Sequence, residues 1–426
     1  MKVVIVNKSD STGGAAVVSR RLMEALRREG VDARMLVCEK LTDSPFIELA
    51  AKPSTIKRKF FLERLKILLA NGFSRDTLFK IDTGEKGLSL WRHPLIKEAD
   101  AIMLNWVNQG MLSLKGVTKI LELEKPVIWT MHDMWCMTGI CHHAGNCNHF
   151  FEECGDCPLL GVKSRAKDLS NQIWRKKQKI YSNRKLTRKM AFVAVSTWLK
   201  NKSLESSLLK KSYLEVIPNA FPIVKENIKK PAVKEKIRLL FGAARLDDPI
   251  KGLDTLKEAT ILLRQEYPGV ADKLELALFG NIKVTSELEG FALPLIMLGV
   301  LRGENEIQKA YETSDILVSA SSYETLPGTL VEAQAYGCIP VSFNQGGQSD
   351  IINGDEIGVL TEYSDNKTER ARNLAEGILK AVTLIENTER FATSLFKMRQ
   401  NVEDKFSYSI IAQKYITLIQ NLKAID

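Results

Sequence analysis

Two acidic residues, Glu324 and Glu332, lie eight positions apart within the stretch from Ser319 to Ser342. The apolar run DILVSAS before Glu324 predicts a strand, and TLVEAQAYG after it predicts a helix that ends at Gly337. A second strand, IPVSF, follows at once. In a parallel α/β sheet such a loop lies at the carboxyl ends of the strands, where ligands bind. The bare spacing also suits two solvated surface charges, so the neighbouring residues must decide between the two interpretations.

The residues around this pair resemble a known enzyme family, the retaining nucleotide-sugar glycosyltransferases of the family 4 group (glycosyl transferases group 1), whose signature is Glu-x7-Glu in a fixed frame. The residues that carry the match are Ser321, Glu324, Glu332, Ala333, Gly337, Pro340 and Val341. The resemblance implies an α/β protein of the GT-B class, with two facing Rossmann-like domains and a cleft between them. It also implies transfer of a hexosyl-type sugar, with retention, from a nucleoside diphosphate sugar to an acceptor hydroxyl.

The resemblance gives the glutamates and their neighbours separate roles. Glu332 is expected to accept hydrogen bonds from the ribose hydroxyls of the donor, beside the backbone amides of Leu330 and Val331. Glu324 is expected to lie near the donor sugar. It is not assigned as a covalent nucleophile, because in retaining enzymes of this shape the leaving phosphate can itself take the acceptor proton.

Two cations, Arg245 and Lys251, lie between a predicted strand, IRLLFGAARL, and a predicted helix, LDTLKEATILLRQ. They match the Arg…Lys-Gly motif of the resembled family. A leaving nucleoside diphosphate gains negative charge as the glycosidic bond breaks; arginine can hold its phosphate in a bidentate manner and lysine as a point charge. We therefore predict that both residues hold the diphosphate and that catalysis needs no cofactor. Taken alone, the motif also suits two solvated loop cations.

The amino-terminal half offers three further candidates. Gly13 and Gly14 follow a buried strand, KVVIVN, and precede a predicted helix, so the backbone can approach a ligand and direct helix amides at a negative group. The resemblance places this loop beside the donor phosphates and the acceptor, and a tight turn is the alternative. His132 ends another predicted strand, PVIWTMHDMW. The resembled family places there a histidine that contacts the donor sugar, and a structural role is the alternative.

A cysteine- and histidine-rich insertion, residues 136–158, follows this strand. Its Cys-x-x-Cys spacing lets two thiolates share one metal ion, which predicts a structural zinc site that fastens the loop behind His132. His142 or His143 could also complete such a site. Reduced loop cysteines and disulfides are the alternatives, and disulfides are disfavoured in a reducing compartment. The predicted ligands are Cys141, Cys147, Cys154 and Cys157.

Length and composition indicate a two-domain enzyme. A chain of 426 residues is too long for one ordinary core, and its 45% hydrophobic and 26% charged residues are typical of a globular protein. We predict an N-terminal Rossmann-like acceptor domain over residues 1–220 and a C-terminal Rossmann-like donor domain over residues 221–405. A charge-rich linker, residues 223–237, joins them. A last helix, residues 406–426, is expected to cross back to the first domain.

The sequence shows no signal-peptide core and no run long enough to span a bilayer, so a cytoplasmic location is expected. A basic segment, residues 54–75, sets one group of cations against one group of apolar residues. The cations are Lys57, Arg58, Lys59, Arg64 and Lys66, and the apolar residues are Phe60, Phe61, Leu65, Leu68 and Leu69. It could lie on the anionic inner face of a membrane, as in resembled enzymes whose acceptor is lipid-linked, or pack its apolar side into the domain. The expected acceptor is a glycan or lipid-linked glycan of bacterial surface polysaccharide or glycoconjugate biosynthesis.

The net charge of +10 leaves open another class, a zinc-containing nucleic-acid-binding protein. Such a protein would gather its cations on one face together with stacking aromatic residues. Here the cations are spread along the chain and only 7% of the residues are aromatic, so no nucleic acid partner is expected. A nucleotide-sugar-binding pseudoenzyme of the same fold is the second alternative. The joint presence of Arg245, Lys251, Glu324 and Glu332 favours an active enzyme.

Overall fold

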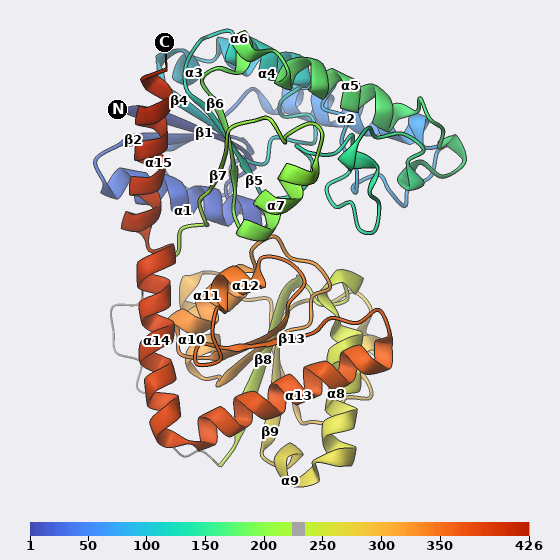
Figure 1. Ribbon diagram of the computed structural model, residues 1–426, viewed down its shortest axis with the longest axis vertical. Coiled ribbons are helices and arrows are strands. Elements are labelled where there is room, and N and C mark those ends of the chain that lie inside the picture. The colour runs from blue at the N-terminus through green and yellow to red at the C-terminus, as the bar shows by residue number, and fades with distance from the viewer. Residues whose placement is uncertain (224–234, 426) are drawn as a thin grey trace. The chain divides into compact units, whose positions relative to one another are not determined.

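The computed structural model describes residues 1–223 and 235–425 (Figure 1). Its internal contacts divide the chain into two compact units. Unit 1 comprises Met1–Ala220 and Tyr408–Asp426, and unit 2 comprises Phe221–Ser407. Most of the predicted linker, residues 223–237, lies outside the described residues.

Unit 1 is built on a seven-stranded sheet with the strand order β3-β2-β1-β4-β5-β6-β7. Every pairing in it is parallel. The middle strands are apolar on both faces, as expected for a parallel sheet that helices cover on both sides. The strands are β1 (Lys2–Ser9), β2 (Asp32–Glu39), β3 (Ile47–Leu49), β4 (Ala101–Leu104), β5 (Val127–Met131), β6 (Met190–Ala194) and β7 (Leu214–Val216).

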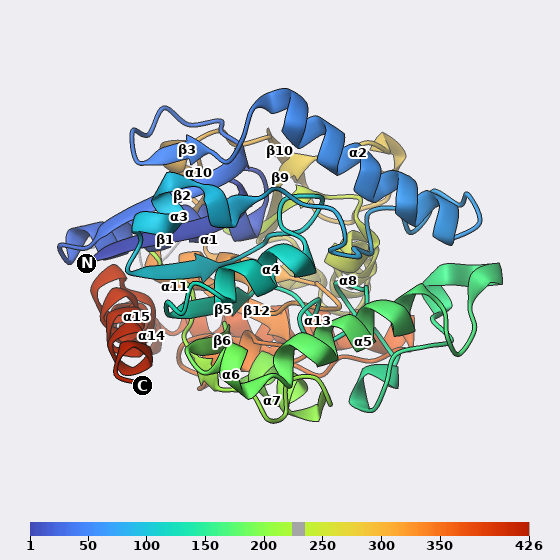
Figure 2. The same ribbon diagram turned by 90° about the horizontal axis from the view of Figure 1, so that it is seen from above.

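The helices of unit 1 connect these strands, and Figure 2 shows the full length of α2 and α5. The last helix of the chain, α15, belongs to the same unit: Tyr415 and Leu418 are buried on it, and the Tyr415 hydroxyl lies 3.0 Å from Oγ1 of Thr130 on β5. The helices are α1 (Gly14–Arg28), α2 (Pro53–Ala70), α3 (Pro94–Glu98), α4 (Leu114–Leu121), α5 (Leu169–Tyr181), α6 (Arg184–Thr187), α7 (Thr197–Glu205) and α15 (Tyr408–Lys423).

Unit 2 contains a six-stranded parallel sheet with the order β10-β9-β8-β11-β12-β13. The strands are β8 (Ile237–Arg245), β9 (Leu274–Asn281), β10 (Leu295–Gly299), β11 (Ile316–Ser319), β12 (Ile339–Phe343) and β13 (Val359–Thr361). The helices are α8 (Leu253–Glu266), α9 (Pro268–Ala271), α10 (Glu304–Glu312), α11 (Gly328–Ala335), α12 (Gln348–Ile351), α13 (Lys367–Glu386) and α14 (Thr388–Phe406).

In both sheets the strand order reverses beside the first strand of the unit. β1 lies between β2 and β4, and β8 lies between β9 and β11. Because the connections on the two sides of such a strand pass over opposite faces of the sheet, the loops at its carboxyl end separate and leave a crevice. We therefore expect ligands to bind after β1 and β4 in unit 1, and after β8 and β11 in unit 2.

The helix α2 places charged residues inside unit 1. Glu63 is fully buried, and its Oε1 accepts hydrogen bonds from the backbone N–H of Thr83 at 2.8 Å and of Gly84 at 3.0 Å. The adjacent Arg64 is buried as well and forms an ion pair with Asp82. These two polar anchors fasten α2 to the segment after residue 81.

Whereas the inner face of α2 carries these charged residues, its outer face carries apolar side chains. Phe61, Leu65 and Leu69 are 62%, 36% and 53% exposed and lie at successive turns of the helix. The interpretation in which the apolar side of this segment packs into the domain is therefore wrong for these three residues, whereas Phe60 and Leu68 are partly buried. The inclusion of Arg64 among the solvated cations is wrong too. The reason is that the buried polar contacts of Glu63 and Arg64 decide which face of the helix turns inward.

Among the residues that the structure describes, no helix is both long enough and apolar enough to cross a membrane.

Candidate functional site

In unit 2 the predicted cations lie at the carboxyl end of β8. Arg245 is the last residue of that strand, and its side chain is 42% exposed beside Asp247 and Asp248. Lys251 ends a short 3-10 turn that leads to Gly252 and α8. Gly252 has a φ of +74°, and a Cβ there would meet the carbonyl oxygen of a neighbouring loop residue at 2.2 Å. The glycine thus lets the loop after β8 touch the loop after β11.

The contact between these loops brings two predicted residues together. Nζ of Lys251 lies 2.6 Å from Oε1 of Glu324, although 73 positions separate them. The backbone N–H of Ser322 also donates to the carbonyl of Ile250 at 2.9 Å. A lysine and a glutamate therefore meet at the point where the sheet of unit 2 reverses, which is where a ligand is expected.

The glycine-bearing loop after β12 covers the backbone of Glu324. The N–H of Gly347 donates to the Glu324 carbonyl at 3.0 Å. A Cβ on Gly346 would lie 2.0 Å from that same oxygen, so no larger residue fits there. The loops after β8, β11 and β12 consequently converge on Glu324.

Glu332 lies on α11, which follows the loop after β11; Figure 1 labels this helix. Its Oε2 accepts a hydrogen bond from the hydroxyl of Tyr311 at 3.1 Å. Leu330 and Val331 are buried, and the N–H of Leu330 donates to the carbonyl of Pro327 at 3.1 Å. The amide of Leu330 is thus engaged in the first turn of the helix.

In unit 1, Gly13 and Gly14 line a pocket of about 700 Å³ at the corresponding reversal of the sheet. The helix α1 begins at Gly14, and Gly13 precedes it with a φ of +87°. The opposite wall comes from Trp106 and Gln109, which follow β4, and from Lys8 at the end of β1. This pocket lies where the strand order predicts a ligand.

His132 directly follows β5. Burial lowers the pKa of its imidazole to about 4, although Asp133 opposes this shift. The ring is therefore neutral near pH 7 and can act as a hydrogen-bonding group, not as a cation.

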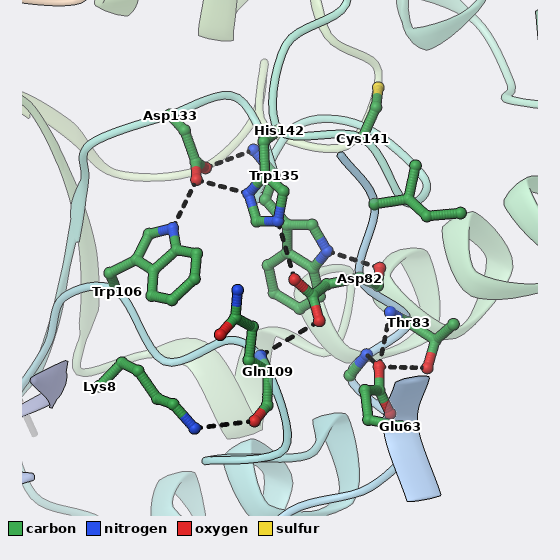
Figure 3. Close-up of polar contacts among 12 residues, drawn as sticks. Lys8, Glu63, Asp82, Thr83, Trp106, Gln109, Asp133, Trp135, Cys141 and His142 are labelled. Carbon is green, nitrogen blue, oxygen red and sulfur yellow. Dashed lines mark hydrogen bonds and ion pairs between the residues drawn. The ribbon is translucent and has the colours of Figure 1, made fainter. Parts of the chain in front are cut away.

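Asp133 connects this strand end to a buried network (Figure 3). Its Oδ2 accepts a hydrogen bond from Nε1 of Trp106 at 2.9 Å and lies 2.6 Å from Nδ1 of His142. Nε2 of His142 lies 2.8 Å from Oδ2 of Asp82, which also pairs with Arg64. Burial by itself would lower the pKa of His142, but the two carboxylates outweigh it and raise the pKa to about 10.

The cysteines of the insertion do not form the predicted zinc site in this structure. Among residues 1–223 and 235–425, no group of three or more His, Cys, Asp or Glu side chains is arranged to hold a metal ion. Burial raises the pKa of Cys154 and of Cys157 to about 12, and the nearby thiols of Cys141 and Cys147 add to the shift. The four proposed ligands, all present as free thiols, are Cys141, Cys147, Cys154 and Cys157.

Several pocket and network residues were not among the candidates from the sequence. Lys8, Trp106 and Gln109 line the pocket of unit 1, and Asp82 supports it from behind. Trp106 could have been found from its position two residues after the apolar run AIML, because strand ends of a parallel sheet gather at one edge. Asp82 follows no such run, and the sequence offered no signal for it.

Comparison with known proteins agrees with this geometry. The family described as Glycosyl transferases group 1 matches residues 224–394, which span most of unit 2. A curated relative, WcaC of Escherichia coli (strain K12), is assigned to colanic acid biosynthesis as a glycosyl transferase. It is 21% identical over 441 aligned residues, which cover 99% of this chain and 100% of the relative.

Solved structures resemble the whole chain. A glycosyltransferase from Rickettsia africae ESF-5 has a TM-score of 0.62 at 14% identity and covers 100% of this chain and 99% of its own. HepE from Anabaena, solved in complex with UDP, has a TM-score of 0.58 at 16% identity, with 99% and 100% covered. Residues 224–394 thus form a glycosyl transferases group 1 domain, carried by a chain with a GT-B fold.

Proposed function

We propose that this protein is a glycosyltransferase that moves a sugar from a nucleoside diphosphate sugar to an acceptor hydroxyl, with retention at the anomeric carbon. The observation that carries the proposal is the meeting of Lys251 and Glu324 at the sheet reversal of unit 2. It lies within the group 1 domain, and Arg245 ends the adjacent strand.

The residues of unit 2 take the donor in this proposal. Arg245 and Lys251 hold the diphosphate, which gains negative charge as the bond from the anomeric carbon to the phosphate oxygen breaks. Glu332 accepts hydrogen bonds from the ribose, and Glu324 lies beside the sugar and orients Lys251. The acceptor oxygen bonds to the anomeric carbon on the same face, and the leaving phosphate takes its proton. An unchanged anomeric configuration of the product, measured by proton NMR, tests retention.

A calorimetric titration with UDP, GDP, ADP and their sugar conjugates tests the donor site. UDP is the first nucleotide to use, because HepE from Anabaena, which shares the fold, was solved with UDP and with UDP-glucose. Saturable binding of one nucleotide family is expected. If none of these nucleotides binds to the folded protein, the proposed function is wrong.

For unit 1 we propose that the pocket beside Gly13 and Gly14 receives the acceptor, and that His132 forms a hydrogen bond to a sugar. Its wall combines the rings of Phe60 and Trp106 with the cation of Lys8, a combination that suits the apolar and polar faces of a sugar. The family relative from Escherichia coli is assigned to colanic acid biosynthesis, so the proposed acceptor is a glycan or lipid-linked glycan of a bacterial surface polysaccharide.

We also propose that α2 rests on an anionic membrane surface. Its exposed apolar residues Phe61, Leu65 and Leu69 lie near the exposed cation Arg58. A groove of about 490 Å³ runs along the helix, and a second segment of the chain contributes the cations Lys163 and Arg165 to its lining. Apolar side chains flanked by cations match the acyl boundary and the negative headgroups of such a surface.

This contact can be measured by co-sedimentation with vesicles of phosphatidylcholine, with and without phosphatidylglycerol. Phe61→Ser is expected to weaken binding to the anionic vesicles roughly tenfold or more, since burying a phenylalanine contributes about 1.5–3 kcal/mol. Phe396→Ser is the matched control, because Phe396 is 69% exposed but lies on α14 of unit 2. Equal binding of both variants to both kinds of vesicle would refute the membrane contact.

A further inference from the structure

Next to the pocket of unit 1 lie two buried side chains, Asp82 and His142, and a partly buried one, Asp133 (Figure 3). His142 reaches this position because residues 80–82 pair with residues 140–142 in an antiparallel manner. The N–H of Asp82 donates to the carbonyl of Ile140 at 2.8 Å, and the N–H of His142 donates to the carbonyl of Lys80 at 3.3 Å. The cysteine-rich insertion therefore delivers one histidine between two carboxylates.

Asp133, at one end of this cluster, contacts the aromatic residue Trp106, which lines the pocket. Asp133 accepts hydrogen bonds from Nε1 of Trp106 at 2.9 Å and from the N–H of Trp135 at 2.8 Å. The Trp106 ring also lies against the His142 ring, with 5.6 Å between the ring centroids. The indole plane of Trp106 is thus held by a carboxylate that is itself held by His142.

Asp82, at the other end of the cluster, is connected through Gln109 to Lys8, a cation that lines the pocket. Oδ1 of Asp82 accepts a hydrogen bond from the N–H of Gln109 at 3.1 Å. Gln109 has a φ of +54°, a backbone conformation that residues other than glycine rarely adopt. Its carbonyl accepts a hydrogen bond from Nζ of Lys8 at 3.0 Å. The position of the Lys8 ammonium group therefore depends on Asp82 through one strained peptide.

We propose that Asp82, His142 and Asp133 are positioning residues that together set Trp106 and Lys8 on the acceptor wall of the pocket. Both ring nitrogens of His142 face carboxylate oxygens, so the ring donates to both and links Asp82 to Asp133. The role of the cysteine-rich insertion is then to present His142. This inference rests on the proposed function, because it assumes that the pocket receives a sugar acceptor.

The first test needs no substrate. The indole N–H signal of Trp106 in a ¹H–¹⁵N spectrum is assigned by its loss in Trp106→Phe. In His142→Gln and in Asp133→Asn this signal is expected to shift and its hydrogen exchange to accelerate about tenfold or more, because the bond to the carboxylate weakens. His149→Gln is the matched control: His149 lies in the same insertion, is exposed and contacts the carbonyl of Gly155. An unaltered Trp106 signal in both test variants would overturn the proposal.

The second test uses transfer kinetics with UDP-glucose as donor and octyl glycosides as soluble acceptors. His142→Gln is expected to raise the KM for the acceptor about tenfold or more, as displaced binding groups do, while the Kd for UDP stays unchanged. Absence of binding of UDP, GDP, ADP and their sugar conjugates by the unaltered protein would contradict the proposed function. Normal UDP binding with an unchanged acceptor KM in His142→Gln would contradict only the positioning role.

Removing His142 leaves two carboxylates buried together, which could unfold unit 1. The double variant His142→Gln, Asp133→Asn removes the histidine together with one carboxylate and leaves Asp82 paired with Arg64. Circular dichroism checks its folding. If it folds, it is expected to show the same mobile Trp106 signal and the same raised KM as the single variants. A double variant with the signal and KM of the unaltered protein would refute the role of the cluster.

Discussion

Arg245→Ala is expected to lower the rate of sugar transfer about 100- to 1000-fold, because the loss of one preorganised charge donor at a centre of developing charge has an effect of that order. The guanidinium of Arg245 lies at the carboxyl end of β8, and its side chain is 42% exposed, so a diphosphate can reach it. Initial rates of nucleoside diphosphate release, at saturating donor, measure the effect.

Two companion variants make this prediction specific. Arg372→Ala removes an arginine of the same unit that forms a surface ion pair with Glu266, and the rate of this variant is expected to match that of the unaltered protein. Arg245→Lys is expected to keep part of the rate, since lysine provides the charge but not the bidentate geometry. A full rate in Arg245→Ala would remove this residue from the donor site.

Glu332→Gln is expected to weaken nucleotide binding about 10- to 100-fold. Hydrogen bonds to a charged group contribute roughly 1.5–3 kcal/mol, and each 1.4 kcal/mol changes Kd tenfold. In the structure the Glu332 carboxylate accepts a hydrogen bond from Tyr311, and a carboxylate can accept several hydrogen bonds at once, as the proposed contact with the ribose requires. Calorimetric titration of the variant with UDP measures the change.

A modified ligand separates ribose binding from an effect on the helix. The unaltered protein should bind 2′-deoxy-UDP more weakly than UDP, whereas Glu332→Gln should distinguish the two much less, since the contact is already lost. Tyr311→Phe tests the internal hydrogen bond alone and is expected to change Kd far less than Glu332→Gln does. If Glu332→Gln discriminates between the ligands as strongly as the unaltered protein, Glu332 does not contact the 2′-hydroxyl.

Local patterns were sufficient for most of the strands and helices near the site. The run DILVSAS contains β11 and the run IPVSF is β12, and the residues of both strands are buried. The segment between the two runs contains Pro327, Gly328 and Gly337, which mark it as a separate turn and helix. The helix predicted over TLVEAQAYG corresponds to α11, which ends just before Gly337. These features depend on residues close together in the chain, so composition and period could reveal them.

The segment containing α2 shows where this reasoning fails. Its apolar and charged residues both recur at helical spacing, so period alone could not say which set faces inward. The buried partners of Glu63 and Arg64 come from residues 82–84, about 20 positions along the chain. Which side of this helix is buried is therefore decided by contacts that no local pattern reports.

The same limit applies to the insertion. Spacing alone made His142 an optional metal ligand, but the structure places its ring nitrogens on Asp82 and Asp133, which lie 60 and 9 positions away. The four cysteines are close in sequence, but among the described residues they do not form a group that could hold a metal ion. Short spacing along the chain limits how far apart the backbones of these residues can lie. The directions of their side chains depend instead on how the loop packs.

Hydrophobic period predicts the alternation of strands and helices, and a short motif identifies the candidate residues Arg245, Lys251, Glu324 and Glu332. Hydrophobic period, glycine positions and a short motif are local properties, and local properties can be read along the chain. Two other features arise from folding: the contact between Lys251 and Glu324, and the position of one buried histidine next to the pocket of unit 1. Such contacts follow from strand order and packing, which join residues far apart in the chain and leave no periodic signal in it.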